Sequence, residues 1–222
     1  MKNILCFGDS NTWGFMPHKD KPPIKADNRF PRDVRWPGKL EKILGDDWHI
    51  IEEGLNGRTA MFDCPMEDHR NGLKAIDFCL LSAMPVDLVI LMLGTNDVKL
   101  LFDKPAYVIA QGIHRLIGRV RHGDYGYGPG GKTPEILVVT PARVTKAVLT
   151  SWLKNEFDAE SVVRSAQLSE YYRQVTDTDG VHFLDAGSVI SADSADGIHM
   201  NAESHARLAE MICEEVKRMF GC

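Results

Sequence analysis

The sequence predicts an α/β fold, a three-layer sandwich in which a five-stranded parallel sheet lies between two layers of helices. The first observation is that five short apolar runs, rich in β-branched residues and as long as buried strands, recur along the chain. The second is that turn residues or a helix-periodic segment follow each run, as the crossovers between parallel strands require. The third is a hydrophobic content of 44%, which supplies a core and excludes a disordered chain.

Local signals place the individual elements. The expected strands are residues 4–7, 48–51, 88–93, 136–139 and 181–184. One helix follows Trp36, with Pro37 near its first position and Gly45 as its stop. Another opens at Asp103 with Pro105 in its first turn, and its apolar residues recur at spacings of three and four. The other helices are expected at 70–83, at 159–174 and from 201 onward.

Two segments interrupt this regular alternation. They are 14–35, which holds four prolines, and 140–157, which follows the fourth strand. Connections longer than about 12 to 15 residues are usually lids, contact surfaces or mobile segments. Since a single α/β domain often reaches the length of this chain, we expect one domain over 1–222.

Charge and hydropathy exclude several kinds of partner. The net charge of −5 comes without the basic stripe that a nucleic-acid binder usually shows, so no nucleic-acid partner is expected. The longest apolar run, 88–93, is far shorter than the roughly 20 residues of a membrane span. The start of the chain also lacks the apolar region of a secretory signal. We therefore expect a cytoplasmic protein.

The cysteines indicate the same compartment. The chain has five of them, Cys6, Cys64, Cys79, Cys213 and Cys222, and no C-x-x-C pair. Their odd number and their scatter suit reduced thiols better than a disulfide framework or a zinc site. We expect neither a metal nor a cofactor.

A glycine-rich segment matches a nucleotide-binding pattern but stands in the wrong place. Residues 126–133 satisfy G-x-x-x-x-G-K-[ST], the loop that cradles nucleotide phosphates. Such a loop follows a strand and opens a helix, whose free N–H groups face the phosphate. Here a helix ending near His122 precedes the segment and the strand 136–139 follows it. We therefore expect a connection between a helix and a strand.

Polar clusters follow four of the five expected strands. They are residues 8–12, 54–59, 94–97 and 196–199. In a parallel α/β sheet, ligands bind beyond the carboxyl ends of the strands, near the point where the strand order reverses. Within the second and third clusters, Gly57 can bring a bare backbone N–H close to a ligand, and Asn96 offers an NH₂ donor. The clusters are therefore where chemistry is expected.

Ser10, at the start of a short helical turn after the first strand, is the candidate nucleophile. A serine hydroxyl needs a base within hydrogen-bond reach and a third group that orients this base. Asp196 and His199 are three residues apart, and on a helical turn this spacing puts both side chains on one side. The sequence thus offers all three groups, although the G-x-S-x-G pattern of α/β-hydrolases is absent.

Other histidines and aspartates compete for these roles. His205 is expected to be a solvated helix residue, and His182 is expected inside or beside the fifth strand. Asp193 and Asp185 are expected to cap a turn and a strand end. Asp196 and His199 therefore stay the preferred pair.

At the four clusters the sequence resembles the GDSL or SGNH hydrolase family. The hallmarks of that family are a Gly-Asp-Ser block near the N-terminus, a glycine block, a Gly-x-Asn-Asp block and a terminal Asp-x-x-His. All four appear in family order and span nearly the whole chain, although Asn11 departs from the leucine of the family name. Longer stretches look like the bacterial arylesterase and acyltransferase branch: 4–10, 12–14, 33–36, 52–55 and 185–191.

The resemblance implies a flavodoxin-like fold and a serine esterase for short acetyl or aryl esters. It implies that Ser10 is the nucleophile, that His199 is the general base and acid, and that Asp196 is the partner of His199. It also implies an oxyanion hole made of the Ser10 N–H, the Gly57 N–H and the Asn96 side chain. Some members transfer acyl groups to alcohols or peroxide, and several are homo-oligomers. The expected partner is a small-molecule ester.

Other functions stay open at this point. A thioesterase or a carbohydrate deacetylase can use the same serine, because the triad does not choose the leaving group. A relative that only binds acylated or nucleotide ligands is an alternative of another class. Trp13 and Phe15 are candidates for the acyl pocket, with core packing as the competing interpretation, and Lys99 is a candidate for the edge of the substrate site.

Overall fold

The sheet has the predicted five parallel strands. The computed structural model describes residues 1–22, 27–122 and 126–222; Pro23, one of the prolines of the 14–35 segment, lies outside these residues. The strands are β1 (Lys2–Gly8), β2 (Trp48–Gly54), β3 (Leu88–Met92), β4 (Glu135–Val139) and β5 (His182–Leu184), in the order β2-β1-β3-β4-β5. This strand order is the flavodoxin-like one. The predicted fold class is confirmed.

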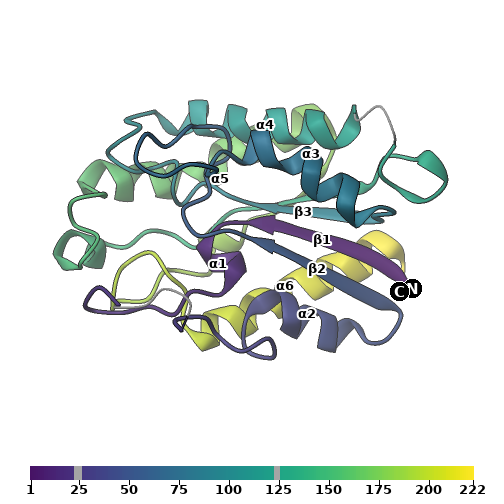
Figure 1. Cartoon of the computed structure of the whole chain (residues 1–222), viewed down its shortest axis with the longest axis horizontal. Coiled ribbons are helices and arrows are strands. Elements are labelled where there is room, and N and C mark those ends of the chain that lie inside the picture. The colour runs from purple at the N-terminus through teal and green to yellow at the C-terminus, as the bar shows by residue number, and fades with distance from the viewer. Residues whose placement is uncertain (23–26, 123–125) are drawn as a thin grey trace.

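Helices cover both faces of the sheet. In the described residues they are α1 (Ser10–Trp13), α2 (Trp36–Leu44), α3 (Gly72–Ala83), α4 (Ala106–Arg121), α5 (Ala159–Asp179) and α6 (Ala202–Phe220). Figure 1 shows α3, α4 and α5 above the sheet and α2 and α6 below it. Short 3₁₀ turns occur at η1 (Pro129–Gly131), η2 (Lys146–Thr150) and η3 (Ala186–Ser188).

Each face of the sheet has its own core. Successive side chains of a strand point to opposite faces. In β1, Leu5 and Phe7 pack with α3, α4 and α5, whereas Ile4 and Cys6 pack with α2 and α6. All five residues of β3 are buried, as expected for a parallel strand that is covered on both faces.

Two helix boundaries differ from the prediction by three residues or more. α4 begins at Ala106 rather than at Asp103, because Asp103 has a φ of 44° and Pro105 is the extended cap residue before the helix. α5 continues beyond the expected end at residue 174 and stops at the left-handed Gly180. Its last five residues contain a single apolar side chain, so the hydrophobic periodicity fades before the helix ends.

The strand register brings three polar clusters to one edge of the sheet. Gly8 of β1 pairs with Gly54 of β2 on one side and with Met92 of β3 on the other. The chain segments that follow these residues therefore leave the sheet next to one another. In Figure 1 this is the left edge, where the strand arrows point, whereas both chain ends lie at the right.

The structure also bears on the expectations for the glycine-rich segment, the cysteines and membrane-spanning helices. Residues 126–133 lead through η1 into β4, as predicted for a connection between a helix and a strand. All five cysteines are free. No helix in the described part of the chain combines the length and the apolar composition needed to cross a membrane.

Candidate active site

Ser10 is the first residue of α1, directly after the end of β1. The side chain of Asp9 caps this short helix, since its Oδ1 accepts the Asn11 N–H at 2.9 Å. The turn is tight: a Cβ on Gly8 would lie 2.0 Å from Thr12 Oγ1, so only glycine fits. As the first helical residue, Ser10 has an N–H without an acceptor inside the helix. Its hydroxyl stands at the carboxyl edge of the sheet, as predicted.

The structure brings Ser10, His199 and Asp196 into one hydrogen-bonded row. His199 Nε2 lies 3.1 Å from Ser10 Oγ, and His199 Nδ1 lies 2.7 Å from Asp196 Oδ2. All three residues are buried, and Ser10 and His199 are each only 4% exposed. Both distances are within the 2.6 to 3.2 Å reach of about one hydrogen bond. The row has the geometry in which an imidazole can take a proton from a serine hydroxyl while a carboxylate orients the ring.

Asp196 is held by backbone donors as well as by His199. The segment around it is a turn and not the expected helical turn, and Gly197 has a φ of 82°. Asp196 Oδ1 accepts the N–H groups of Ile198 and His199 at 3.0 and 2.9 Å, and Oδ2 also accepts the His18 N–H at 3.2 Å. Burial by itself would raise the pKa of Asp196, but the hydrogen bonds from His199 and Ile198 outweigh it and hold that pKa below its usual value. The carboxylate therefore stays ionised beside the imidazole.

Asn11 ties the histidine segment to the serine helix. Its Nδ2 donates to the Ile198 carbonyl at 3.0 Å, and its Oδ1 accepts the Met200 N–H at 2.9 Å. These two bonds flank His199 on both sides. Asn11 is the position at which this sequence departs from the family name, and no local pattern could indicate its contact with Ile198, because 187 residues separate the two.

Both long segments of the chain contact the turn that carries Asp196. In the 14–35 segment, the His18 carbonyl accepts the Trp152 Nε1–H of the 140–157 segment at 3.1 Å. The Thr145 N–H donates to the Gly197 carbonyl at 2.9 Å. A Cβ on Gly197 would lie 2.2 Å from Val148 N, so the 3₁₀ turn η2 rests directly on this glycine. The 14–35 and 140–157 segments therefore hold the turn that carries Asp196.

The candidates for substrate contact lie in different surroundings. Phe15 is buried and stacks on the His199 ring, with centroids 4.4 Å apart and an interplanar angle of 29°. The Trp13 ring lies 6.1 Å from the Phe15 ring and has the Arg29 guanidinium above it at 4.9 Å. The Lys99 ammonium pairs with Glu156 at 2.6 Å. For all three residues, contact with a substrate stays a prediction.

Gly57 and Asn96 lie in the turns after β2 and β3, the two neighbours of β1. Gly57 has a φ of 78°, a conformation that favours glycine. Asn96 is buried, and one of its Nδ2 hydrogens goes to the Arg58 carbonyl at 3.1 Å. The buried Arg58 guanidinium in turn donates to the carbonyls of Gly8, at 3.0 Å, and Glu53. These bonds join the three clusters at the edge of the sheet.

The turn after β3 also carries a buried carboxyl group to which the sequence assigned no role of its own. Asp97 is fully buried, and both of its oxygens accept the Ala60 N–H, at 2.9 and 3.1 Å. Burial, with a contribution from the charge of Asp9, raises the pKa of Asp97 to about 7. Its position directly after Asn96 was the available signal.

The other histidines and aspartates that were candidates for the triad have other roles, and the prediction for His205 is wrong. His205 is not solvated but completely buried, because α6 packs this face against α2, and its Nδ1 accepts the Trp36 N–H at 3.2 Å. Burial lowers the pKa of His205 to about 3. His182 is the first residue of β5, and Asp185 caps η3, as predicted. Asp193 accepts the Ala195 N–H at 2.8 Å, which is the expected turn cap.

Within the described residues, no three His, Cys, Asp or Glu side chains lie in a group that could hold a metal ion.

The sequence model of one family matches most of the chain. This is the GDSL-like lipase/acylhydrolase family, and its model matches residues 6–207. The chain belongs to this family. The family and its ester-hydrolysing class of enzyme are as the sequence predicted.

Solved structures of esterases are similar to the whole chain. An inhibitor-bound aryl esterase of M. smegmatis is 38% identical with a TM-score of 0.91, and the match covers 98% of this chain and 99% of that one. A carbohydrate acetylesterase from Sinorhizobium meliloti is 39% identical with a TM-score of 0.91, over 99% and 100% of the two chains. A putative arylesterase from Agrobacterium tumefaciens is 35% identical with a TM-score of 0.86, over 98% and 99%. No curated protein matches the chain.

Proposed function

We propose that this member of the GDSL-like family hydrolyses short-chain acyl esters through an acyl-serine intermediate. The observation that carries the proposal is the hydrogen-bonded row from Ser10 through His199 to Asp196. Family membership and the esterase neighbours support the same class of reaction.

The first half of the proposed reaction acylates the serine. His199 Nε2 takes the hydroxyl proton as Ser10 Oγ forms a bond to the ester carbonyl carbon. The tetrahedral intermediate then expels the alcohol, which leaves with the proton that His199 carried. Asp196 keeps the imidazole oriented and offsets its transient positive charge. In the second half, water attacks the acyl-serine with the help of His199; an alcohol or peroxide in place of water would receive the acyl group.

The developing oxyanion needs preorganised donors. We assign this role to the Ser10 N–H, the Gly57 N–H and the second Nδ2 hydrogen of Asn96. The Ser10 N–H has no acceptor inside its helix, and Gly57 lies with a positive φ in the turn after β2. The bond from Asn96 to the Arg58 carbonyl fixes the plane of its amide group.

Burial of the row favours a small acyl group. Ser10 and His199 are each 4% exposed, and the Phe15 ring covers one face of the imidazole. Because solvent reaches the reacting atoms so little, we expect acetyl esters to react faster than long-chain esters.

A covalent probe and one substitution test the proposal. Ser10→Ala should abolish turnover of 4-nitrophenyl acetate, with a loss of at least about 10⁴-fold. An organophosphonate should label the unaltered protein once, at Ser10, and should leave Ser10→Ala unlabelled. A protein that only binds ligands would neither turn over the ester nor react with the probe, and such a result would overturn the proposal.

Three further expectations belong to the same proposal. We propose that the protein is a single domain, that it works in the cytoplasm and that it forms a homo-oligomer. The five free cysteines support a reducing compartment. Exposed apolar side chains such as Leu100, Leu101 and Tyr107 support self-association. One cooperative unfolding transition, and a mass above one chain by light scattering, are the expected results.

A further inference from the structure

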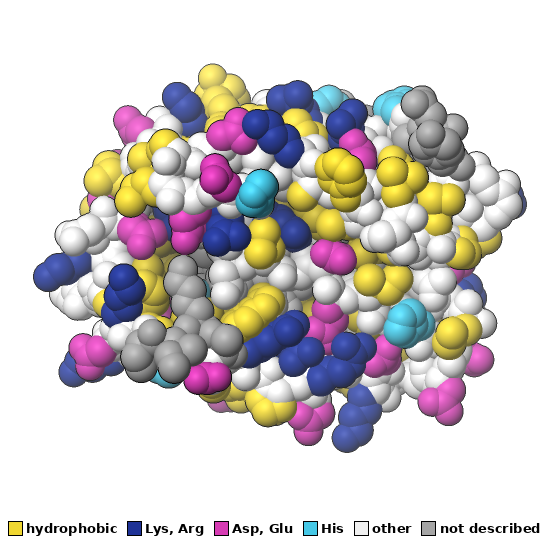
Figure 2. All heavy atoms as spheres, in the orientation of Figure 1, with side chains coloured by type: hydrophobic (Ala, Val, Ile, Leu, Met, Phe, Trp, Pro, Cys, Tyr) yellow, Lys and Arg dark blue, Asp and Glu magenta, His cyan; other side chains and the backbone are white. Residues whose placement is uncertain are grey.

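A buried guanidinium lies among the three turns that supply the proposed oxyanion donors. Figure 2 shows basic side chains that stand at the surface of the molecule, but Arg58 is only 4% exposed. Its Cζ lies 4.1 Å from the centroid of the Phe7 ring in β1. Among the described residues, no ion pair includes Arg58. Burial lowers the pKa of Arg58, so the fold keeps this cation inside at a cost in free energy.

The guanidinium joins the ends of β1 and β2. Its Nη1 donates to the Gly8 carbonyl at 3.0 Å and to the Glu53 carbonyl. Gly8 is the last residue of β1, two residues before Ser10, and Glu53 lies near the end of β2. The Gly8 carbonyl also accepts the Leu55 N–H at 3.1 Å. The Arg58 side chain therefore folds back over the start of its own turn and ties this turn to the strand that leads into Ser10.

The backbone of Arg58 contacts the segments of the other two proposed donors. Its N–H donates to the Leu55 carbonyl at 3.0 Å, which closes the turn that contains Gly57. Its carbonyl accepts one Nδ2 hydrogen of Asn96 at 3.1 Å. One residue thus contacts, through its side chain and its backbone, the segments of all three donors.

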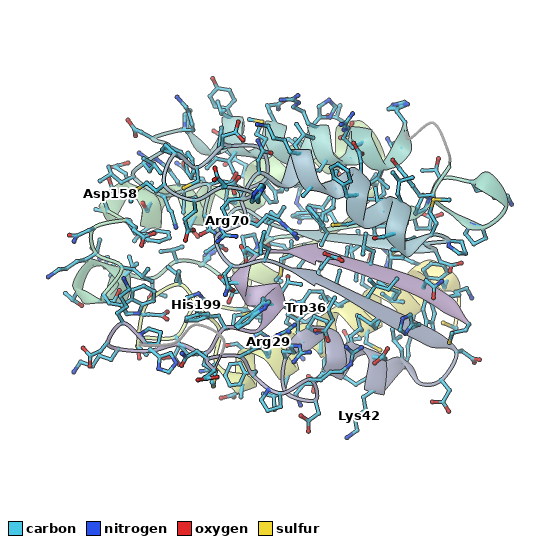
Figure 3. All side chains as sticks on the ribbon, in the orientation of Figure 1. Arg29, Trp36, Lys42, Arg70, Asp158 and His199 are labelled. Carbon is cyan, nitrogen blue, oxygen red and sulfur yellow. The ribbon has the colours of Figure 1, made fainter. Side chains whose placement is uncertain are left out.

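Other side chains also restrict the turn of Gly57. A Cβ built on Gly57 would lie 3.1 Å from Glu67 Oε2 and 3.3 Å from Arg70 Nε. In Figure 3, Arg70 and His199 are both labelled at the end of the sheet to which the strands point. The turn of Gly57 and the base of the triad therefore lie at the same end of the sheet.

An oxyanion hole needs donors that stand in the right place before the reaction begins. Here the three proposed donors come from three separate turns, and a misplacement of about 1 Å can cost about 10²-fold in rate. Hydrogen bonds from a charged group are roughly twice as strong as those between neutral groups. The bonds from the guanidinium to the carbonyls of Gly8 and Glu53 are therefore well suited to keep these turns in register.

We propose that Arg58 is a positioning residue for the oxyanion hole. Its guanidinium holds the turn of Gly57 against the end of β1, and its carbonyl holds the amide group of Asn96. Arg58 acts through these donors and not on the substrate itself. The inference rests on the proposed esterase function and adds to it a residue that belongs neither to the triad nor to the oxyanion hole.

Arg58→Met tests the inference, because it keeps much of the side-chain volume and removes the charge and the N–H donors. The measured quantities are kcat/KM for 4-nitrophenyl acetate and the Ki of 1,1,1-trifluoroacetone. Ser10 Oγ adds to the carbonyl carbon of this ketone, the serine proton passes to His199, and the carbonyl oxygen becomes an oxyanion. Its Ki therefore reports on the oxyanion hole. In Arg58→Met, kcat/KM should fall and Ki should rise in parallel, by about 10- to 100-fold.

Arg58→Lys gives a second measurement if the methionine variant fails to fold. A lysine keeps a positive charge and N–H donors for the same carbonyls, although its side chain is shorter. The two quantities should then change by only about fivefold, because part of the hydrogen bonding is kept.

A double-substitution cycle with Asn96→Ala shows whether Arg58 acts through the oxyanion hole. Arg58→Met should cost less in a protein that already lacks one of the positioned donors. The combined loss in kcat/KM should therefore be smaller than the product of the two single losses, by at least about threefold. Losses that multiply in full would overturn the inference.

Arg35 offers a matched control beside the other face of the sheet. It is also buried, directly before α2, and pairs with Glu52 at 2.6 Å. Arg35→Met should destabilise the fold and leave kcat/KM and Ki within about twofold of the unaltered protein. A folded Arg58 variant that behaves in the same way would also overturn the inference. The esterase proposal is tested separately, because Ser10→Ala must lose turnover whatever the Arg58 variants do.

Discussion

The serine and the histidine of the active site are held in place by different means. Ser10 is positioned by residues close to it in sequence: Asp9 caps its helix, Gly8 permits the tight turn and Gly14 closes the helix on the Ser10 carbonyl. The turn from Asp196 to His199 has local hydrogen bonds to Asp196 Oδ1, but it also depends on Asn11 and His18, which are 178 to 189 residues away. No helix or strand hydrogen bonds support that turn.

This difference indicates how the site can fail. A serine at the junction of a strand and a helix keeps its position as long as β1 and α1 form. A histidine in an irregular turn keeps its position only while remote segments stay packed against it. Substitutions of the groups that surround the oxyanion should therefore change mainly the chemistry, whereas substitutions of the groups that hold the turn of His199, Asn11 among them, should change stability and activity together.

Among substitutions that leave Ser10, His199 and Asp196 in place, the largest effect is expected for Asn96→Ala, on the serine side. Loss of one oxyanion donor typically costs about 10² to 10³ in rate, or about 3 to 4 kcal/mol of transition-state stabilisation. The kcat for 4-nitrophenyl acetate should fall by this factor. Circular dichroism should show a folded protein, destabilised by only about 1 kcal/mol through the lost bond to the Arg58 carbonyl. A loss of less than tenfold would remove Asn96 from the oxyanion hole.

Asn11→Leu, on the histidine side, should lower the stability of the fold more than it lowers the activity. It leaves the buried Met200 N–H and Ile198 carbonyl without their partner, at a cost of about 1 to 3 kcal/mol for each group. We expect a lower midpoint of urea unfolding and a fall in kcat of about tenfold. Asn3→Leu, at the other end of β1, removes an exposed hydrogen bond and should cost less stability. Full activity with unchanged stability in Asn11→Leu would contradict the claim that contacts with Asn11 hold His199 in position.

His205→Gln should change how stability depends on pH. Because burial lowers the pKa of His205 from 6.5 to about 3, the unfolded chain binds a proton between these values that the folded protein does not bind. Stability due to His205 is therefore lost as pH falls from 6.5 towards 3, at up to about 1.4 kcal/mol per pH unit. In His205→Gln this loss should disappear.

Urea unfolding at several pH values gives the required measurement. Asp97, whose raised pKa makes stability fall as pH rises towards 7, is present in both proteins and cancels from the comparison. His182→Gln removes a histidine from β5 and serves as the matched control. Equal slopes for His205→Gln and the unaltered protein between pH 4 and about 6 would contradict the burial of His205.

The smallest effect is expected for Trp152→Phe. The substitution removes the Nε1–H that holds the His18 carbonyl, while the N–H of the same His18 donates to Asp196. A hydrogen bond of this kind contributes about 0.5 to 1.5 kcal/mol, so kcat should fall about two- to tenfold with little change in KM. Trp48→Phe, at the amino end of β2, is the control. A change in KM alone would indicate that Trp152 contacts substrate instead.

Much of the fold could be predicted because its signals are local. Apolar runs such as 88–93 become buried strands, and Pro37 and Gly45 bound a helix, through preferences that act within a few residues. The parallel sheet then places every cluster that follows a strand at one edge. Residues 8–12, 54–59 and 94–97 lie where the sequence indicates, since the register of β1 with β2 and β3 requires it.

Only the tertiary structure decided which remote groups meet at that edge. Several of these contacts join parts of the chain that no periodicity relates. They are the hydrogen bonds of Asn11, the convergence of two long segments on His18, the burial of His205, and the contact of Glu67 and Arg70 with Gly57. Such contacts depend on how whole elements pack against one another. The sequence by itself therefore determined the strands, the helices and the residues that can react, and packing determined how these residues are held and what lies beside them.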